Sequence, residues 1–185
     1  MKPHRRQFLD KALLYLFSLD VESDMDREEI GFVSGGVKLT IFARPDLSRV
    51  YHLARERTIP GLGFEALSGT LSWGGDWVLW REDDLEQSQV RASLSLDDDA
   101  VIHMTYQVVT NLTPGGFRRI VSEKKGSKIG KEDAPVNWPV VTSPRFETSD
   151  PRYRWITEYQ CIGYGLVQII QSEVRRLTYD VYAMS

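Results

Sequence analysis

A carboxyl group and an indole ring stand next to each other at Asp76 and Trp77, directly after two glycines and shortly before Arg81. In a Gly-Gly-Asp segment the aspartate commonly accepts hydrogen bonds from its own turn, and a tryptophan commonly packs in the core. A carboxyl group held against an indole can also have a raised pKa and transfer protons. We therefore take Asp76 as a candidate catalytic acid or base, and Trp77 and Arg81 as candidate substrate-binding residues.

His103 is the second candidate catalytic residue, because it lies on a segment in which apolar and polar side chains alternate. One face of residues 101–109 is apolar and includes Tyr106, whereas His103 shares the opposite face with Thr105 and Gln107. Such a polar face usually meets solvent, but in a closed β-barrel one face of every strand lines the interior. A histidine on that wall can act as a general base or hydrogen-bond donor near neutral pH. The ring of Tyr106 is a candidate substrate contact.

A third cluster combines Arg145, Tyr153 and Trp155 with two acids, Glu147 and Asp150. One interpretation is a rigid loop whose arginines pair with these acids and whose aromatic rings cap the core. The alternative is the mouth of a barrel that orients an oxygenated ligand. In that case Arg145 is a candidate catalytic residue, and Tyr153 and Trp155 are candidate substrate-binding residues.

Sequence motifs for cofactors and metals are missing from the chain. The segment 61–63 has only the first two glycines of a dinucleotide fingerprint, and it precedes a strand where that fingerprint opens a helix. No phosphate-binding loop, serine nucleophile elbow or His-Glu-x-x-His zinc pair occurs. The histidines, His4, His52 and His103, are far apart, and the lone Cys161 excludes a disulfide framework and a cysteine zinc cage. We predict that the protein uses no cofactor and binds no metal.

Strands must position these residues, because most apolar segments are short, alternate with polar residues and end at Gly, Pro, Asn or Asp clusters. The expected strands are residues 13–21, 37–43, 67–73, 77–81, 91–96, 101–109, 157–170 and 174–182. Residues 74–76 are expected to form a turn or bulge, and residues 97–99 the turn of a hairpin. The pattern is typical of an all-β fold.

One domain over residues 1–185 accounts for the length and for a hydrophobic content of 42%. A chain of this size buries roughly 70% of the surface that its unfolded form exposes, so one core is sufficient. Residues 1–11 are expected to form a loose tail or a short helix. Residues 111–150 are expected to form a long mobile loop, and residues 44–63 a second long connection.

The net charge is −3, so the chain lacks the basic excess that draws a protein to nucleic acid or to an anionic membrane. No apolar run is long enough to span a bilayer or to form a secretory signal. We therefore expect a cytoplasmic protein whose partner is a small molecule, with no nucleic acid and no membrane partner. A homodimer is left open.

Several short blocks resemble, in order and spacing, the family of proteins of unknown function called DUF3237. They are Gly69-Thr70, Gly74-Gly75-Asp76-Trp77 with Arg81, Leu96-Asp97-Asp98-Asp99, Ser143-Pro144-Arg145-Phe146-Glu147-Thr148, Asp150-Pro151-Arg152-Tyr153 with Trp155, and Tyr179-Asp180-Val181-Tyr182. The chain departs from the family pattern at Asp99, where members typically have glycine, and at Pro139–Thr142, where they often have Tyr-x-Arg-Thr. The resemblance implies a single antiparallel β-barrel, similar to calycin-type or allene-oxide-cyclase-type barrels. It implies no settled activity.

Our leading functional hypothesis is a cofactor-independent isomerase or cyclase of secondary metabolism. It would act inside the barrel on an apolar oxygenated metabolite, such as a polyketide, a terpenoid or an aromatic compound, because substrate folding and a few fixed dipoles can supply the acceleration. The alternatives are a non-catalytic ligand-binding barrel and an interaction module whose barrel is filled by side chains. Since Trp77 and Trp80 are an odd number of residues apart on one strand, one is expected in the lumen and the other outside.

Overall fold

The structure is a computed structural model that describes residues 13–22, 26–42, 46, 48–51, 59, 62–123, 136–170 and 173–184. The expected N-terminal tail or helix lies outside these residues. The strands are β1 (Leu13–Glu22), β2 (Asp26–Val33), β3 (Gly36–Phe42), β4 (Ser48–Tyr51), β5 (Gly69–Arg81), β6 (Leu85–Leu96), β7 (Val101–Asn111), β8 (Val136–Thr142), β9 (Arg145–Glu147), β10 (Gln160–Ile170) and β11 (Glu173–Met184). They are joined by helix α2 (Gly116–Glu123) and the 3-10 helix η2 (Arg154–Glu158).

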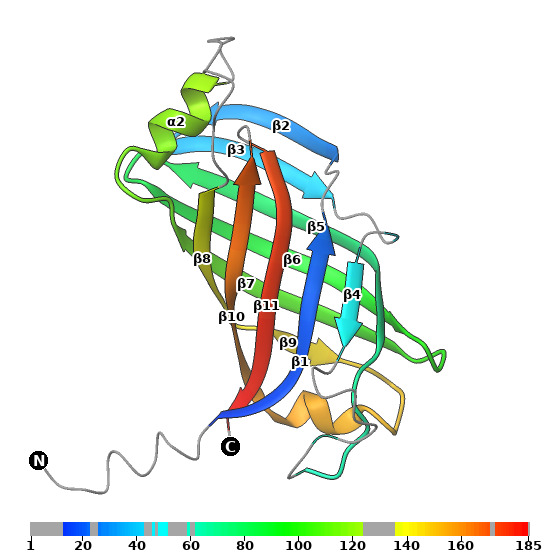
Figure 1. The fold of residues 1–185 in the computed structure, drawn as a ribbon. Helices are drawn as coiled ribbons and strands as arrows, with labels where there is room; N and C mark the ends of the chain where they lie inside the picture. Colours follow the sequence, from blue (N-terminus) through cyan, green and yellow to red (C-terminus); the bar gives the residue numbers. More distant parts are fainter. Residues whose placement is uncertain are drawn as a thin grey trace, which may run out of the picture.

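The strands form a closed antiparallel barrel, as the family resemblance implied. Its circuit runs β5, β4, β1, β11, β10, β8, β7, β6 and back to β5, which makes a barrel of 8 strands. The β2–β3 hairpin extends from β5, and β9 pairs with β7 beyond the end of β8. In Figure 1 helix α2 lies near one end of the barrel and η2 near the opposite end.

Strand β5 carries the Gly-Gly-Asp segment, which was expected to form a turn or a bulge. Residues 74–76 continue the strand, and the irregularity is a bulge between Leu71 and Trp73. The bulge changes which residues face inward, from Leu71 before it to Asp76 and Trp80 after it. A Cβ at Gly74 would come within 2.9 Å of Leu71 Cδ2, so an alanine there would require the end of the Leu71 side chain to move.

The predicted hairpin between residues 91–96 and 101–109 is present as β6 and β7, and its acidic turn is closed by the backbone. The amide of Leu96 donates to the carbonyl of Ala100 at 2.9 Å, and Asp99 donates to Leu96 at 3.1 Å. Asp99 has a φ of 69°, the left-handed conformation that glycine normally takes and aspartate tolerates. The family's usual glycine is therefore replaced here without loss of the turn.

The segment 111–150 was expected to be one long loop, but it contains α2, β8 and β9. Strand β8 escapes recognition because Pro139 lies in its middle and proline is rare within sheets. The strand tolerates Pro139 because its pairing with β7 covers only Val140 to Thr142. Likewise, the expected connection over residues 44–63 contains the short strand β4.

Two groups of buried apolar side chains fill the barrel. The larger group includes Leu16, Phe17, Leu94, Ile102 and Ile156. Leu16 and Phe17 are both buried, although they are neighbours, because β1 has a bulge between Tyr15 and Phe17. The smaller group lies against α2 and comprises Val37, Leu39, Val78, Trp80, Leu112, Ile120 and Trp138.

Strand β2 is the last strand on one side of the sheet order. Its pairing with β3 shifts register between Glu29 and Gly31, and Gly31 has a φ of 100°, which favours glycine. The strand therefore departs from regular pairing close to its midpoint.

Candidate functional site

Polar side chains gather in the lumen because the inward alternation of several strands places them there. The residues are Asp76 on β5, Glu86 and Ser88 on β6, Tyr106 and Thr110 on β7, Thr142 on β8 and Tyr179 on β11. All but Asp76 and Glu86 are buried, and these two keep a small exposed fraction. A group of this size inside an otherwise apolar barrel is the candidate functional site.

The Asp76 carboxyl group is one of two acids in this group. Its Oδ1 atom is buried and has no hydrogen-bond partner among the described residues. Burial raises the pKa of Asp76 to about 7, and the nearby charge of Glu86 adds to this shift, whereas the Ser88 hydroxyl opposes it. A carboxyl group with a pKa close to neutrality can both accept and return a proton under physiological conditions.

Glu86 is the second inward acid. It faces Trp80 across the β5–β6 ladder, and the Trp80 Nε1 atom donates a 2.9 Å hydrogen bond to Glu86 Oε2. Burial raises the pKa of Glu86, and this hydrogen bond from Trp80 opposes the shift. The indole therefore holds one oxygen of Glu86 in place within the lumen.

Tyr106 and Tyr179 form an aromatic wall beside the two acids. Their ring centroids are 5.8 Å apart in an edge-to-face arrangement. Burial raises the pKa of both phenols. Both tyrosines therefore stay protonated near neutral pH and can donate a hydrogen bond to an oxygen atom.

A cavity of about 70 Å³ opens beside Asp76, Glu86 and Tyr106. Its other walls are apolar and are formed by Val21, Ile41, Leu71, Gly74, Gly75, Val90, Val167 and Leu177. Among them Ile41, Val167 and Leu177 are partly exposed, so the cavity borders solvent on this side. Because the two core groups fill the rest of the described interior, the barrel encloses a small pocket rather than a wide lumen.

The structure brings Asp76 and Tyr106 together but places His103 and Arg145 elsewhere. His103 faces outward, because Met104 and Tyr106 occupy the inward positions of β7. It lies opposite Glu147 on β9, whereas Arg145 lies opposite Thr105. The expectation that His103 lines the lumen is therefore wrong, and Arg145, which was expected at the mouth of the barrel, is exposed and does not line the luminal cavity.

Trp77 and Trp80 lie on opposite faces of β5, as their odd spacing predicted. Trp80 is buried, with 4% of its surface exposed, and Trp77 lies outside, with 37% exposed. Arg81 also lies away from the cavity, and its guanidinium pairs with Asp83 at 2.5 Å. Neither Trp77 nor Arg81 thus contacts the luminal cavity.

Tyr153 and Trp155 close the end of the barrel at η2, which favours the cap interpretation of their loop. The Tyr153 hydroxyl donates to Asp98 Oδ2 at 2.8 Å, and the Trp155 ring stacks on Phe64 with a centroid distance of 4.9 Å. Arg152 pairs with Asp150 and also with Asp98, each at 2.7 Å. These contacts hold η2 against the turn between β6 and β7.

Sequence reasoning missed Glu86, Ser88 and Tyr179. The predicted strand began at residue 91, because residues 85–89 are mostly polar and show no apolar alternation. The available signal was the parity of the strand. Val90, Ala92 and Leu94 face inward, so extending β6 backward by two-residue steps places Ser88 and Glu86 in the lumen.

None of the helices in the described part of the chain is long and apolar enough to cross a membrane. The described residues also contain no group of three or more His, Cys, Asp or Glu side chains that could hold a metal ion. The cluster at Asp76 accordingly has two acids, phenols and hydroxyls as its polar groups.

Comparison with known proteins finds relatives both by sequence and by structure. A UPF0311 protein of Rhodopseudomonas palustris is 30% identical over 115 residues, which cover 58% of this chain and 69% of that protein. Its crystal structure superposes with a TM-score of 0.64 at 20% identity, covering 94% of this chain and 97% of that one.

Two further crystal structures share the fold. A β-barrel-like protein from Acinetobacter baumannii has a TM-score of 0.61 at 18% identity, over 94% of this chain and 95% of that one. An enzyme from Penicillium herquei has a TM-score of 0.52 at 12% identity, over 94% and 93% of the two chains. The family model for proteins of unknown function DUF3237 matches residues 33–184. The chain therefore belongs to the DUF3237 family.

Proposed function

We propose that this protein is a cofactor-independent enzyme that isomerises or cyclises a small oxygenated molecule at the luminal cavity. The observation that carries the proposal is the buried Asp76 carboxyl group, whose pKa is about 7 and whose Oδ1 atom lacks a protein partner among the described residues. Perturbed acids in a cavity are common at sites of proton transfer. Glu86 and Tyr106 supply further polar groups on the same cavity.

In an isomerisation the Asp76 carboxylate takes a proton from a carbon next to a substrate carbonyl. The electron pair of the broken C–H bond moves into the carbonyl, and the neutral phenol of Tyr106 donates a hydrogen bond to the developing oxyanion. Where a carbon–carbon double bond is conjugated with this enolate, Asp76 then protonates the far carbon of the conjugated system and the double bond moves towards the carbonyl. Because the proton on Asp76 can exchange with solvent before it is returned, the reaction in D₂O incorporates deuterium. In a cyclisation, the deprotonated atom instead bonds to an electrophilic carbon of the same molecule before the proton returns. Neither sequence needs an oxidant or another reactant.

The size and lining of the cavity support a particular kind of substrate. An apolar cavity of about 150 Å³ can hold benzene, so about 70 Å³ accommodates only the reacting edge of a larger molecule. The remainder would lie along the apolar side formed by Ile41, Val167 and Leu177. Polyketide, terpenoid and aromatic metabolites combine apolar bulk with an oxygenated edge. We propose a role in secondary metabolism and a cytoplasmic location for this activity.

A non-catalytic binding barrel is the second candidate, and the hydroxyls of the lumen favour it. Thr142 Oγ1 is buried without a hydrogen-bond partner among the described residues, and the hydroxyls of Ser88 and Thr110 face the carboxyl groups of Asp76 and Glu86. These groups can fix an oxygenated ligand without any proton transfer.

The experiment that separates the two candidates is solvent isotope exchange. The protein is incubated in D₂O with a panel of enolisable aromatic ketones and hydroxyketones, and deuterium incorporation is followed by mass spectrometry. Asp76→Asn should lower the exchange rate about a hundredfold, whereas Glu147→Gln, an exposed acid on β9, should leave it unchanged. The wild-type rate should rise as the pH passes through about 7, since the base must be ionised. Ligand binding without exchange would favour the binding barrel, and full exchange by a folded Asp76→Asn protein would remove Asp76 from the mechanism.

A further inference from the structure

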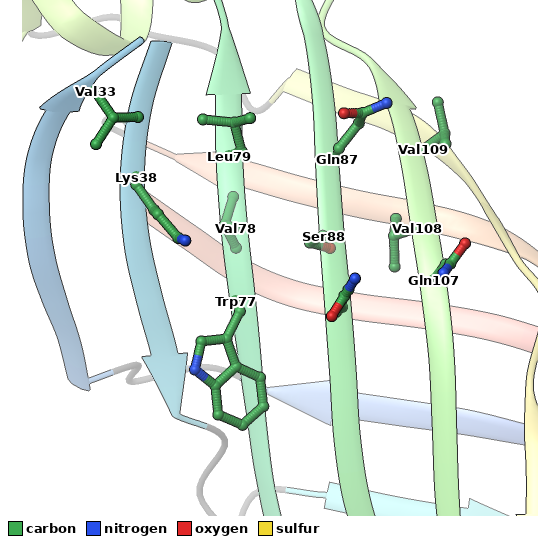
Figure 2. A pocket seen from close by; sticks show the side chains of 11 residues that line it. Val33, Lys38, Trp77, Val78, Leu79, Gln87, Ser88, Gln107, Val108 and Val109 are labelled. Carbon is green, nitrogen blue, oxygen red and sulfur yellow. The ribbon is translucent and has the colours of Figure 1, made fainter. Parts of the chain in front are cut away.

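The outer face of the barrel carries a shallow groove that the luminal chemistry does not use. Two adjoining hollows, of about 540 Å³ and 450 Å³, share Gln89 and Gln107 as lining residues. The first extends from β2 across β3, β5 and β6 to β7. The second continues along β6 and β7 to Arg145 at the start of β9. Figure 2 looks onto the first hollow.

The indole of Trp77 forms a flat platform in this groove. Figure 2 shows the ring lying along β5 with its broad face turned outward. Gly75, two residues earlier on the same face, makes this possible, because a Cβ there would come within 3.3 Å of the indole. An outward-facing ring attracts positively polarised C–H groups through its negative face.

Neutral amide groups lie next to the platform. Trp77 pairs with Gln89 on β6, and Gln89 pairs with Gln107 on β7, so the indole and both amides form one row across three strands. Gln87 adds a third exposed amide two residues further along the same face of β6. Each amide offers both a donor and an acceptor, which matches a hydroxyl group that does the same.

The charges around the groove are all positive. Lys38 lines the first hollow, Arg91 and Arg145 line the second, and no Asp or Glu lines either. None of the three makes an ion pair with any of the described residues. The Arg91 guanidinium lies over the Trp77 ring, 5.8 Å from its centre, so this exposed side chain has to swing aside when another group stacks on the ring. The chain as a whole has a net charge of −3, so the positive charge around the groove does not simply reflect the overall composition.

We propose that the outer groove binds an acidic oligosaccharide containing uronic acid residues. The C–H face of a pyranose ring would pack on Trp77, its hydroxyls would bond to the glutamine amides, and its carboxylates would pair with Arg91 and Arg145. An extended peptide is normally recognised through pockets for its side chains. The main aromatic feature of this groove is instead the flat indole of Trp77, which suits the face of a sugar ring. Single-stranded nucleic acid is normally held by successive stacking aromatic residues, whereas among the described residues that line the groove Trp77 is the only aromatic side chain that faces outward.

The test is a titration of the full chain with a tetrasaccharide of galacturonic acid, followed by calorimetry at low and high salt. The uncharged tetrasaccharide of galactose and a short single-stranded oligonucleotide are titrated in parallel. Uronate binding should be detectable at millimolar concentration or below, should weaken with salt, and should exceed binding of the neutral sugar at least fivefold.

Two variants locate the binding. Trp77→Ala should weaken uronate binding at least tenfold, whereas Trp73→Ala, an exposed indole on the same strand but outside both hollows, should leave it unchanged. Arg145→Gln should weaken binding of the uronate but not of the neutral sugar. If Trp77→Ala fails to fold, Gln107→Leu serves in its place and should also weaken binding of both sugars.

Three results would overturn the proposal. They are no uronate binding at millimolar concentration, an equal loss of binding in Trp73→Ala and Trp77→Ala, and tighter binding of the oligonucleotide than of the uronate. Because Asp76 lies inside the barrel and this groove lies outside, failure of the luminal proposal does not affect this test.

Discussion

At the scale of single residues, the chemistry of the lumen depends on how Asp76 and Glu86 are kept from water. Both pKa values are raised by burial, and among the described residues no basic side chain lines their cavity. Trp80 fixes one oxygen of Glu86, whereas Asp76 Oδ1 has no partner among the described residues. The two acids therefore differ in their surroundings. The hydrogen bond from Trp80 restricts the Glu86 carboxyl group, whereas Asp76 Oδ1 is available to bond to a ligand or to accept a proton.

The raised pKa of Asp76 predicts a specific pH dependence of stability. In the unfolded chain the carboxyl group ionises near its ordinary value of 3.8, but in the folded protein it stays protonated up to about pH 7. The folded state therefore binds more protons between these values, so the free energy of unfolding should fall as pH rises from about 4 to about 7. The loss reaches about 4 kcal/mol above pH 7, at 1.36 kcal/mol for each unit of pKa.

Asp76→Asn should remove most of this loss, so the variant should be more stable than wild type at pH 8 and nearly equal at pH 4. Urea denaturation at several pH values measures the difference. Asp99→Asn, in the exposed turn between β6 and β7, is the matched control and should keep the wild-type pH dependence. A wild-type stability that rises between pH 4 and pH 7 would contradict the buried state of Asp76.

Asp76 and Tyr106 could be predicted as site residues, because both stand out on recognisable strands. Glu86 could have been found by extending the alternation of β6 backward from Val90, but Tyr179 could not, since its place in the site depends on which strands lie across the barrel from each other. The sequence analysis chose Trp77 as a candidate substrate-binding residue, whereas Trp80 is the tryptophan that faces inward, and the sequence alone could not decide between them. The sequence states that the two rings face opposite ways, but only the bulge before Gly74 decides which one enters the lumen.

At the scale of secondary-structure elements, close backbone approach determines where glycine is required. Gly165 on β10 faces Tyr179 across the ladder with β11. A Cβ at Gly165 would lie 1.9 Å from the carbonyl oxygen of Thr178 and 2.4 Å from Tyr179 Cβ. Neither atom can move without separating β10 from β11.

Gly165→Ala should therefore destabilise the protein by about 3 kcal/mol or more, as severe overpacking does. Gly74→Ala should cost clearly less, because its nearest neighbour is the end of the flexible Leu71 side chain at 2.9 Å. Denaturation midpoints of the two variants make the comparison. Equal losses would indicate that the β10–β11 ladder can shift at Gly165.

The long strands were predictable where they alternate clearly, as in β3, β7 and the second half of β6. Strands β8 and β9 were not, since a central proline and a length of three residues remove the local signal. These strands form because the barrel needs partners for β7 and β10, which is a requirement of the whole sheet. The closed barrel itself came from the family resemblance rather than from any strand alone.

At the scale of the whole molecule, closure of the barrel protects the chain's single cysteine. Cys161 is buried on β10, and burial raises the pKa of its thiol to about 11. The thiolate is the reactive form, so the folded protein should be nearly inert to thiol reagents at pH 8.

Labelling of Cys161 should therefore proceed at the rate at which the barrel opens. With a chromogenic disulfide reagent, the rate should increase steeply with urea and should match the unfolding rate measured by tryptophan fluorescence. The fully denatured chain provides the upper limit. Rapid labelling in native buffer, with the thermal transition unchanged, would show that β10 opens locally while the rest of the barrel stays closed.

The position of β2 at the end of the strand order also affects behaviour at high concentration. An open strand edge is a template on which a second chain can add, and the exposed side chains of Ile30 and Phe32 would stabilise such an aggregate. Glu28 and Glu29 bring negative charge to this edge, and the kink at Gly31 keeps it from being flat. Colloidal solubility of the protein therefore depends on a few residues outside the barrel, and they can be changed without touching its interior.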